Sequence, residues 1–278
     1  YSDLYLRSLY FDLLINYNVI IFESLDLRNI NKHYTNNLIL TINNYHDLLV
    51  YEKSNKDIRV HIQVDTGMNR IGIRSIDVCN KIINRKSQNI KIQGIYTHYA
   101  SNANEYEYFT KQQEKFLEYL SLYNFKVIHS NATSSLHKNI IGNMVRVGIG
   151  MFGYHSKLPL KQVVTCTTKL INLFNLACFD HLGYEGKYTS KGEEVIGVVD
   201  LGYYDSSIID KVYINNKAYK FIGKTCMNHA YIKLDNEINY LSRLRILPIN
   251  DIIDNDEYDY YKLLTSFDHL KKNYIERI

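Results

Sequence analysis

The chain has 278 residues, enough for one large or two ordinary domains, and its 46% hydrophobic content is typical of a packed globular protein. The net charge is +4 with basic and acidic residues interspersed, which argues against a nucleic-acid-binding surface. The sequence contains no run of eighteen apolar residues and hence no candidate membrane-spanning helix. The four cysteines form no CxxC pair, which disfavours a zinc site or disulfide framework and favours a reducing cytoplasm.

The first half of the sequence alternates between short apolar runs and stretches with helical spacing. The runs are rich in β-branched residues, as buried strands are. This alternation predicts an α/β fold with a parallel sheet, part of a (β/α)8 TIM-like barrel, although a doubly wound sheet fits the same pattern. The predicted strands are residues 19–22, 38–42, 60–64, 90–96, 126–128 and 144–147. Helical spacing is found at Leu4, Leu9, Leu13 and Leu14, and at Phe109, Phe116, Leu117 and Leu120 after Asn104 and Glu105.

Beyond Pro159 the alternation stops, and short apolar segments are separated by turn residues such as Asn215 and Asn216. This pattern predicts an antiparallel, mostly β domain. We place the boundary near Ser156, which gives a partial barrel over residues 1–155 and a β domain over residues 156–278. The predicted strands of the second domain are residues 195–200, 212–214, 219–222 and 230–234.

The most informative segment is DTGMNRIG at residues 65–72, which directly follows a predicted strand. Barrel enzymes carry their active sites at the carboxyl ends of the strands, so a functional site is expected here. Taken alone, the segment is equally compatible with a surface turn, because Asp and Gly favour turns. Five further segments follow in order: GIYTHYA at 94–100, NMVRVGI at 143–149, GYEGKYT at 183–189, GYYD at 202–205 and CMN at 226–228.

Together these six segments resemble the alanine racemase family, and the resemblance extends from about Tyr1 to Tyr274. It implies a barrel that holds pyridoxal 5'-phosphate, followed by a β domain. It also implies that L-alanine and D-alanine are interconverted through an aldimine of this cofactor by two bases, which supplies D-alanine for peptidoglycan. A cytoplasmic homodimer with shared active sites is further implied, without a metal ion, a nucleic-acid partner or a membrane.

The resemblance also assigns the catalytic groups. The family's lysine lies on the first barrel strand in a segment like VKANAYG, which is not found here. Residues 1–24 resemble the part of the family's barrel that runs from its second strand into its third, and the chain begins with Tyr1 instead of Met. We therefore expect this lysine upstream of residue 1. Tyr184 is matched to the second base, on the opposite face of the substrate. Arg146 is matched to the partner of the pyridine nitrogen, which stays neutral because arginine keeps its proton. His98 would link Arg146 to Tyr184 and favour the phenolate.

The remaining assignments concern the phosphate group and the substrate. The backbone N–H groups of Gly148 and Ile149 and the hydroxyl of Thr133 are expected to bind the phosphate, and glycine lets the main chain approach an anion. Three residues are assigned to the substrate: Arg70 to its carboxylate and the cofactor's phenolic oxygen, Met227 to the carboxylate through its N–H, and Tyr203 to the entrance.

Several positions depart from the family, which leaves alternatives open. Racemisation of serine or another amino acid would share every motif, and an inactive remnant that binds the cofactor or a partner would fit the substitutions. A fold-related decarboxylase is disfavoured, because a carboxylate would then replace Arg146. By residue type alone, Arg146 could also form a salt bridge and His98 could be a core residue. The departures are Gln63 for a lysine, Ala132 for an asparagine, Asn228 for an aspartate, His269 for a tyrosine and Asn273 for an arginine.

Overall fold

The computed structural model describes residues 17–100, 106–155, 157–206, 208–235, 243–246 and 264. The chain divides into two compact units, Tyr1–Gly148 and Ile149–Ile278. The boundary near Ser156 stays a prediction, since Ser156 lies outside the described residues. Several other predicted features also lie outside the described residues: the helix of Leu4, Leu9, Leu13 and Leu14, the helix start at Asn104 and Glu105, and the positions His269 and Asn273.

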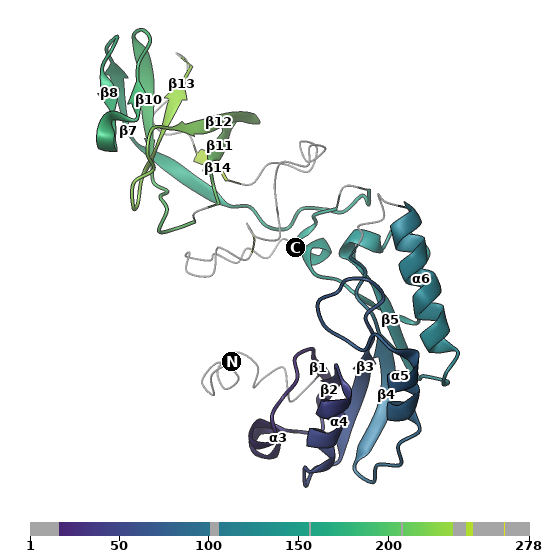
Figure 1. The fold of residues 1–278 in the computed structure, drawn as a ribbon. Coiled ribbons are helices and arrows are strands. Elements are labelled where there is room, and N and C mark those ends of the chain that lie inside the picture. Colours follow the sequence, from purple (N-terminus) through teal and green to yellow (C-terminus); the bar gives the residue numbers. More distant parts are fainter. Residues whose placement is uncertain are drawn as a thin grey trace, which may run out of the picture. The chain divides into compact units, whose positions relative to one another are not determined.

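The first unit contains a curled parallel sheet whose six strands lie in sequence order, β1-β2-β3-β4-β5-β6 (Figure 1). This order is that of a (β/α)8 barrel, whereas a doubly wound sheet reverses its strand order at a switch point. The predicted partial barrel is therefore confirmed, and the doubly wound alternative is wrong. The strands are β1 (Val19–Ile21), β2 (Leu38–Ile42), β3 (Ile58–Gln63), β4 (Ile90–Tyr96), β5 (Val127–Ala132) and β6 (Met144–Arg146).

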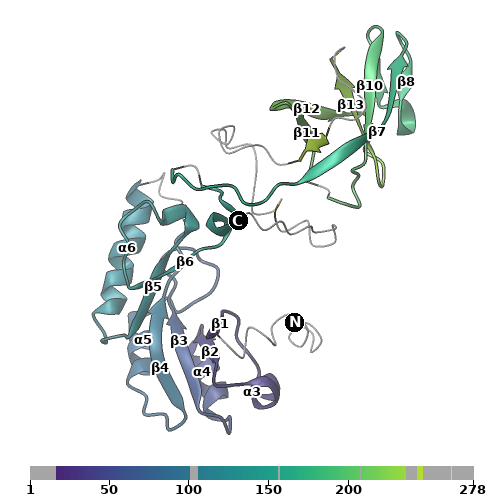
Figure 2. The same ribbon diagram turned by 180° about the vertical axis from the view of Figure 1, so that it is seen from behind.

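Helices α4, α5 and α6 lie on one face of this sheet (Figures 1 and 2). The apolar pattern did not predict helices α3, α4 and α5. They are only seven or eight residues long, which is too short for a clear periodicity. Each begins at a polar N-cap, Asp26, Asn44 or Ser75, whose side chain accepts a hydrogen bond from the first turn. The described helices are α3 (Leu27–His33), α4 (Tyr45–Glu52), α5 (Ile76–Ile83) and α6 (Tyr106–Leu120).

Strand β3 illustrates how the sequence divides the two faces of the sheet. Ile58, Val60 and Ile62 belong to the hydrophobic core that the helices cover. Side chains alternate along a strand, so Arg59, His61 and Gln63 lie on the inner face. The inner face of β3 is therefore polar and carries buried hydrogen-bonding groups.

The second unit is mostly β, as predicted. Six strands form a closed barrel in the order β10-β13-β12-β11-β14-β7, and β8 pairs with β9. The predicted turn at Asn215 and Asn216 is present, and both residues adopt the left-handed conformation with φ of 49° and 67°. The longest strand, β7, was not predicted. The strands are β7 (Thr167–Leu176), β8 (His181–Leu182), β9 (Tyr188–Thr189), β10 (Glu194–Val199), β11 (Lys211–Ile214), β12 (Lys217–Ile222), β13 (Ala230–Leu234) and β14 (Arg243–Arg245).

No helix in the described ranges combines the length and the apolar character that a bilayer crossing requires.

Helix α6 corrects one detail of the sequence analysis. Phe109, Phe116 and Tyr119 are buried, whereas Leu117 is 51% exposed. Because consecutive residues of a helix are about 100° apart, Leu117 lies beside the buried stripe and not within it.

Phe116 and Leu117 therefore form a matched pair of neighbouring residues. Phe116→Ala is expected to lower the free energy of unfolding of the first unit by about 3–5 kcal/mol, because it leaves a cavity in the core. Leu117→Ala should lower it by less than about 1 kcal/mol. Native-state hydrogen exchange of the β3 amides measures both values. Equal losses for the two variants would contradict the packing of α6.

Candidate active site

Arg146, the last residue of β6, is held by protein acceptors around its guanidinium group. Its Nη1 atom lies 2.5 Å from Nδ1 of His129 and 3.1 Å from the His129 carbonyl oxygen. Its Nη2 atom donates to the carbonyl oxygens of Thr97 at 2.7 Å and Ser130 at 3.0 Å. These acceptors match the Nη hydrogens of a guanidinium, whose remaining donor is Nε–H. Nε–H is thus the donor that Arg146 can offer to a ligand.

Arg146 is a half-buried cation without a carboxylate partner among the described residues. Burial lowers its pKa to about 10, and the phenols of Tyr96 and Tyr99 partly offset this effect. The guanidinium carbon lies 5.4 Å from the centre of the Tyr96 ring, which itself stacks on His129 with ring centres 4.5 Å apart. Arg146 therefore keeps its charge at neutral pH, and that charge is available to a bound group.

His98 follows β4 and lies next to Arg146, with 3.5 Å between its Nδ1 and Nη2 of the arginine. Burial lowers the pKa of His98 to about 4, with further lowering by the charges of Arg146 and Arg70. His98 is consequently neutral at pH 7. The predicted contact between His98 and Tyr184 joins the two units, which are described separately, so it stays a prediction.

The turn that carries Arg70 is organised by Asp65. The Asp65 carboxylate accepts hydrogen bonds from the N–H groups of Gly67 and Asn69, each at 3.0 Å, and from Nε of Arg74 at 3.1 Å. Burial opposes ionisation of Asp65, but these hydrogen bonds outweigh it and hold its pKa below the usual value. Asn69 has a φ of 56°, a conformation that asparagine tolerates well. Arg70 is thereby placed on the exposed part of this turn.

The Gln63 side chain supports the turn that carries Arg70 by a hydrogen bond to the backbone of that turn. Its side chain accepts a hydrogen bond from the Tyr96 hydroxyl at 2.7 Å and donates to the Ile71 carbonyl oxygen at 3.2 Å. The Tyr96 hydroxyl also lies 3.2 Å from Oγ1 of Thr41. Gln63 therefore restrains Ile71, the residue next to Arg70, through a neutral side chain.

Thr133 and Gly148, both expected at the phosphate, lie side by side. The Gly148 N–H donates to Oγ1 of Thr133 at 3.0 Å. A Cβ atom at Gly148 would meet no other atom within 4 Å, so there is open space beside this backbone. Ile149 is buried in the core of the second unit, and its part in phosphate binding stays a prediction.

The other predicted residues belong to the second unit and are exposed. Tyr184, Tyr203 and Met227 have exposed fractions of 64%, 56% and 52%. The Tyr203 N–H donates to the Cys226 carbonyl oxygen at 3.1 Å, which holds the loops of Tyr203 and Met227 together. Tyr184 begins a short 3-10 turn, and an ion pair of 2.7 Å between the next residue, Glu185, and Lys224 ties this turn to the same loop.

The sequence analysis missed three residues that surround Arg146: Tyr96, His129 and His61. His129 contacts Arg146 directly, and Nδ1 of His61 lies 3.0 Å from Nε2 of His129. The alternation of polar and apolar residues in β3 was a usable indication, because it places His61 on the inner face. No comparable pattern singled out His129.

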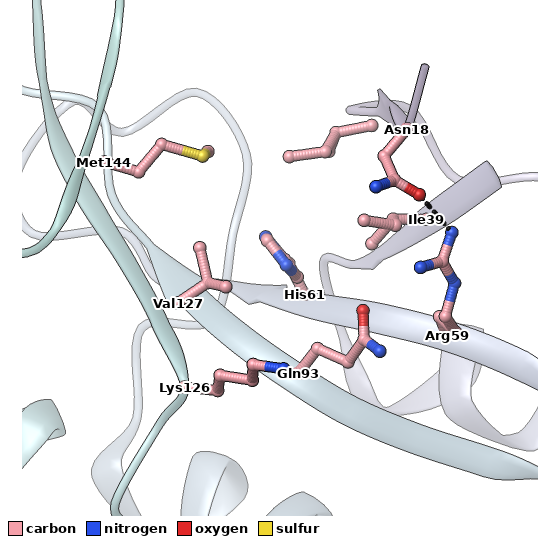
Figure 3. A pocket seen from close by; sticks show the side chains of 9 residues that line it. Asn18, Ile39, Arg59, His61, Gln93, Lys126, Val127 and Met144 are labelled. Carbon is pink, nitrogen blue, oxygen red and sulfur yellow. Dashed lines mark hydrogen bonds between the residues drawn. The ribbon is translucent and has the colours of Figure 1, made fainter. Parts of the chain in front are cut away.

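A cavity of about 310 Å³ lies along the inner face near the amino ends of the strands (Figure 3). Within it, the Arg59 guanidinium donates to Oδ1 of Asn18 at 2.8 Å. None of the predicted site residues borders the cavity, and Arg146 lies at the carboxyl end of its strand. The lining residues are Asn18, Ile20, Ile39, Arg59, His61, Gln93, Lys126, Val127 and Met144.

The buried histidines link stability to pH. Burial, followed by the charge of Arg59, lowers the pKa of His61 to about 4. Burial, followed by Arg146 and His61, lowers the pKa of His129 to about 2. An unfolded histidine titrates near a pKa of about 6.5, so below that pH the unfolded chain binds protons that the folded chain does not. The free energy of unfolding must therefore fall as the pH is lowered from about 6.5 to about 4.

His129→Asn tests this linkage, because an amide oxygen can still accept from Arg146 but does not titrate. Between about pH 7.5 and pH 5 the variant should lose about 2 kcal/mol less stability than the parent protein. Urea titrations at a series of pH values measure the difference, and the exposed His46→Asn serves as the matched control. A pH dependence identical to that of the parent would contradict the neutral, buried state of His129.

Known proteins resemble both units of this chain. Two family models match: the N-terminal domain of alanine racemase over residues 11–156 and the C-terminal domain over residues 163–256. The alanine racemase of Fusobacterium nucleatum is 31% identical over 220 residues, which cover 72% of this chain and 62% of the relative. The solved alanine racemase of E. faecalis has a TM-score of 0.72 and 26% identity, and the match covers 82% of this chain and 68% of that one.

A structure of alanine racemase from Bartonella henselae with covalently bound pyridoxal phosphate has a TM-score of 0.71 at 18% identity, a likeness of fold alone. That match covers 83% of this chain and 70% of the other. The chain spans about three fifths of the length of the curated relatives that it matches, 59% and 62% for two of them. The family models nevertheless match both units, and the chain belongs to the alanine racemase family.

Proposed function

We propose that the protein containing this chain is an alanine racemase that uses pyridoxal phosphate to interconvert L-alanine and D-alanine. The enzyme would act in the cytoplasm, where it would supply D-alanine for cell-wall synthesis. Membership of the family supports the reaction. The observation that carries the proposal is the state of Arg146, a half-buried cation whose Nη hydrogens are engaged by the protein while Nε–H remains for a ligand.

The residues present fit the proposed cofactor. Nε–H of Arg146 would donate to the pyridine nitrogen and leave it unprotonated, because arginine does not give up its proton. The open space beside Gly148, next to the Thr133 hydroxyl, suits the phosphate group. When bound, pyridoxal phosphate withdraws electrons from the substrate and makes its α-hydrogen acidic. His98, which is neutral, would pack close to the ring without adding charge.

The substrate would be held by one residue of the first unit and two of the second. Arg70 would pair with the substrate carboxylate, to which Met227 would offer its backbone N–H, and Tyr203 would line the entrance. The phenol of Tyr184 would exchange a proton with the α-carbon on one face. A second base on the opposite face of the α-carbon would complete the inversion.

Tyr184 lies in the second unit, whereas Arg146 lies in the first. We therefore propose a homodimer in which the second unit of one subunit completes the site in the first unit of its partner, as twofold symmetry allows. The exposure of Tyr184, Tyr203 and Met227 supports this arrangement, because clustered exposed apolar side chains mark interaction surfaces.

The direct test of the reaction is Tyr184→Phe in the complete protein. This variant removes one of two bases, so interconversion of L-alanine and D-alanine should stop. One enantiomer, whose hydrogen faces the remaining base, should still exchange that hydrogen with solvent deuterium. Mass spectrometry of both enantiomers measures the exchange, and Tyr204→Phe, also exposed in the second unit, is the control. Equal residual exchange of the two enantiomers would exclude Tyr184 as a base.

The dimer is tested by mixing two inactive variants, Arg70→Ala and Tyr184→Phe. Both side chains are exposed, so both variants should fold. A mixed dimer has one site with both defects and one with neither. Random exchange makes about half of the dimers mixed, so up to about a quarter of the parent activity should return. No recovery after verified subunit exchange would place Arg70 and Tyr184 in sites formed by a single subunit.

A further inference from the structure

Three side chains form a continuous hydrogen-bonded line on the inner face of the barrel. Nη1 of Arg146 lies 2.5 Å from Nδ1 of His129, and Nε2 of His129 lies 3.0 Å from Nδ1 of His61. The two imidazole rings are buried, with exposed fractions of 0% for His129 and 1% for His61. The line thus runs from the candidate active site to the cavity that His61 borders (Figure 3).

The chemistry of arginine sets the direction of every hydrogen bond in this line. A guanidinium only donates, so Nδ1 of His129 must accept and carries no hydrogen. The proton of the neutral His129 ring is therefore on Nε2, which donates to Nδ1 of His61. His61 accepts at Nδ1, and its own proton is in turn on Nε2. One donor-only group therefore fixes the tautomers of two histidines.

The hydrogen-bonded line ends at a donor on His61 that has no acceptor. Nε2 of His61 is buried and has no hydrogen-bond partner. A buried unsatisfied donor destabilises a protein, and an apolar side chain of similar size would avoid this loss. Gly94 lies against this end of the ring, since a Cβ atom there would lie 2.6 Å from the Val127 carbonyl oxygen and 2.8 Å from Nε2 of His61.

We propose that His61 is a positioning residue for Arg146, which it holds indirectly by fixing the ring of His129. His129 has a partner on each ring nitrogen, so the ring cannot turn without breaking a hydrogen bond. Without the acceptor on His61, the Nε2–H of His129 would be a buried donor with no partner. Reorientation of the ring would then become energetically favourable. Reorientation would remove the acceptor at Nη1 and loosen the guanidinium.

The consequence for a ligand rests on the proposed function. A guanidinium held at Nη1 and Nη2 can direct Nε–H to one position, whereas a loosened guanidinium samples several. His61 would therefore influence how tightly Arg146 holds the ring nitrogen of the cofactor, although no hydrogen bond joins His61 to Arg146. The geometry itself concerns only residues of this chain and can be tested without cofactor.

The experiment measures tautomers and hydrogen exchange in the full chain at pH 7. Nitrogen-15 spectra of the labelled histidines distinguish a ring nitrogen that carries a hydrogen from one that does not. Both His129 and His61 should carry theirs on Nε2. The exchange of the Arg146 guanidinium hydrogens with solvent reports how firmly this side chain is held.

Two substitutions at His61 form a matched pair. His61→Asn keeps an oxygen acceptor near the position of Nδ1, whereas His61→Leu, of comparable size, removes it. His61→Leu should speed exchange at Arg146 by about tenfold, the effect of losing roughly one hydrogen bond, and His61→Asn should restore slow exchange. If His61→Leu does not fold, the tautomers of His129 and His61 in the parent protein still decide the proposal.

A hydrogen on Nδ1 of His129 in the parent protein would overturn the proposal, whatever the variants do. Unchanged exchange at Arg146 in His61→Leu, or equal exchange in the Leu and Asn variants, would overturn it as well. These measurements need no cofactor and no turnover. The positioning role can therefore stand if racemisation fails, and racemisation can be confirmed if the positioning role fails.

Discussion

The organisation of the first unit depends on one property of arginine, that its guanidinium donates hydrogen bonds and accepts none. Because Arg146 is largely withdrawn from solvent, its surroundings supply acceptors, and they do so with backbone carbonyl oxygens and one histidine nitrogen. A carboxylate there would neutralise the charge, whereas these neutral acceptors leave it in place. The strand ends thus hold a positive charge at the carboxyl edge of the sheet, the edge where barrel enzymes bind their ligands.

The two units contribute to the proposed reaction in different ways. The first buries its polar groups in a network that includes Gln63, Tyr96 and His129, which makes the site rigid. The second presents its candidate residues, among them Tyr184 and Met227, on an exposed surface. In the proposed homodimer, the preorganised barrel of one subunit and the exposed loop surface of its partner would together form the site.

Much of the architecture could be predicted because local sequence determines it. Runs such as residues 38–42 are apolar and β-branched, and they became strands of the parallel sheet. Strand β7 was missed because TTKLINLFNL lacks a regular alternation, and its role in closing a barrel depends on distant partners. The same distinction holds for the site. Asp65 stabilises its own turn and could be found by motif, whereas His129 meets its partners 17 and 68 residues away. No local pattern reports such convergence.

We propose that Arg146, held by neutral acceptors, would present a positive charge to the ring nitrogen of a bound cofactor. The nitrogen-15 chemical shift of ring-labelled pyridoxal phosphate bound to the protein tests this directly. We expect the shift of an unprotonated pyridine nitrogen that accepts a hydrogen bond, unchanged across the neutral pH range. The shift of a protonated pyridinium nitrogen would contradict it, because a donor-only guanidinium cannot be the partner of a nitrogen that already carries a hydrogen.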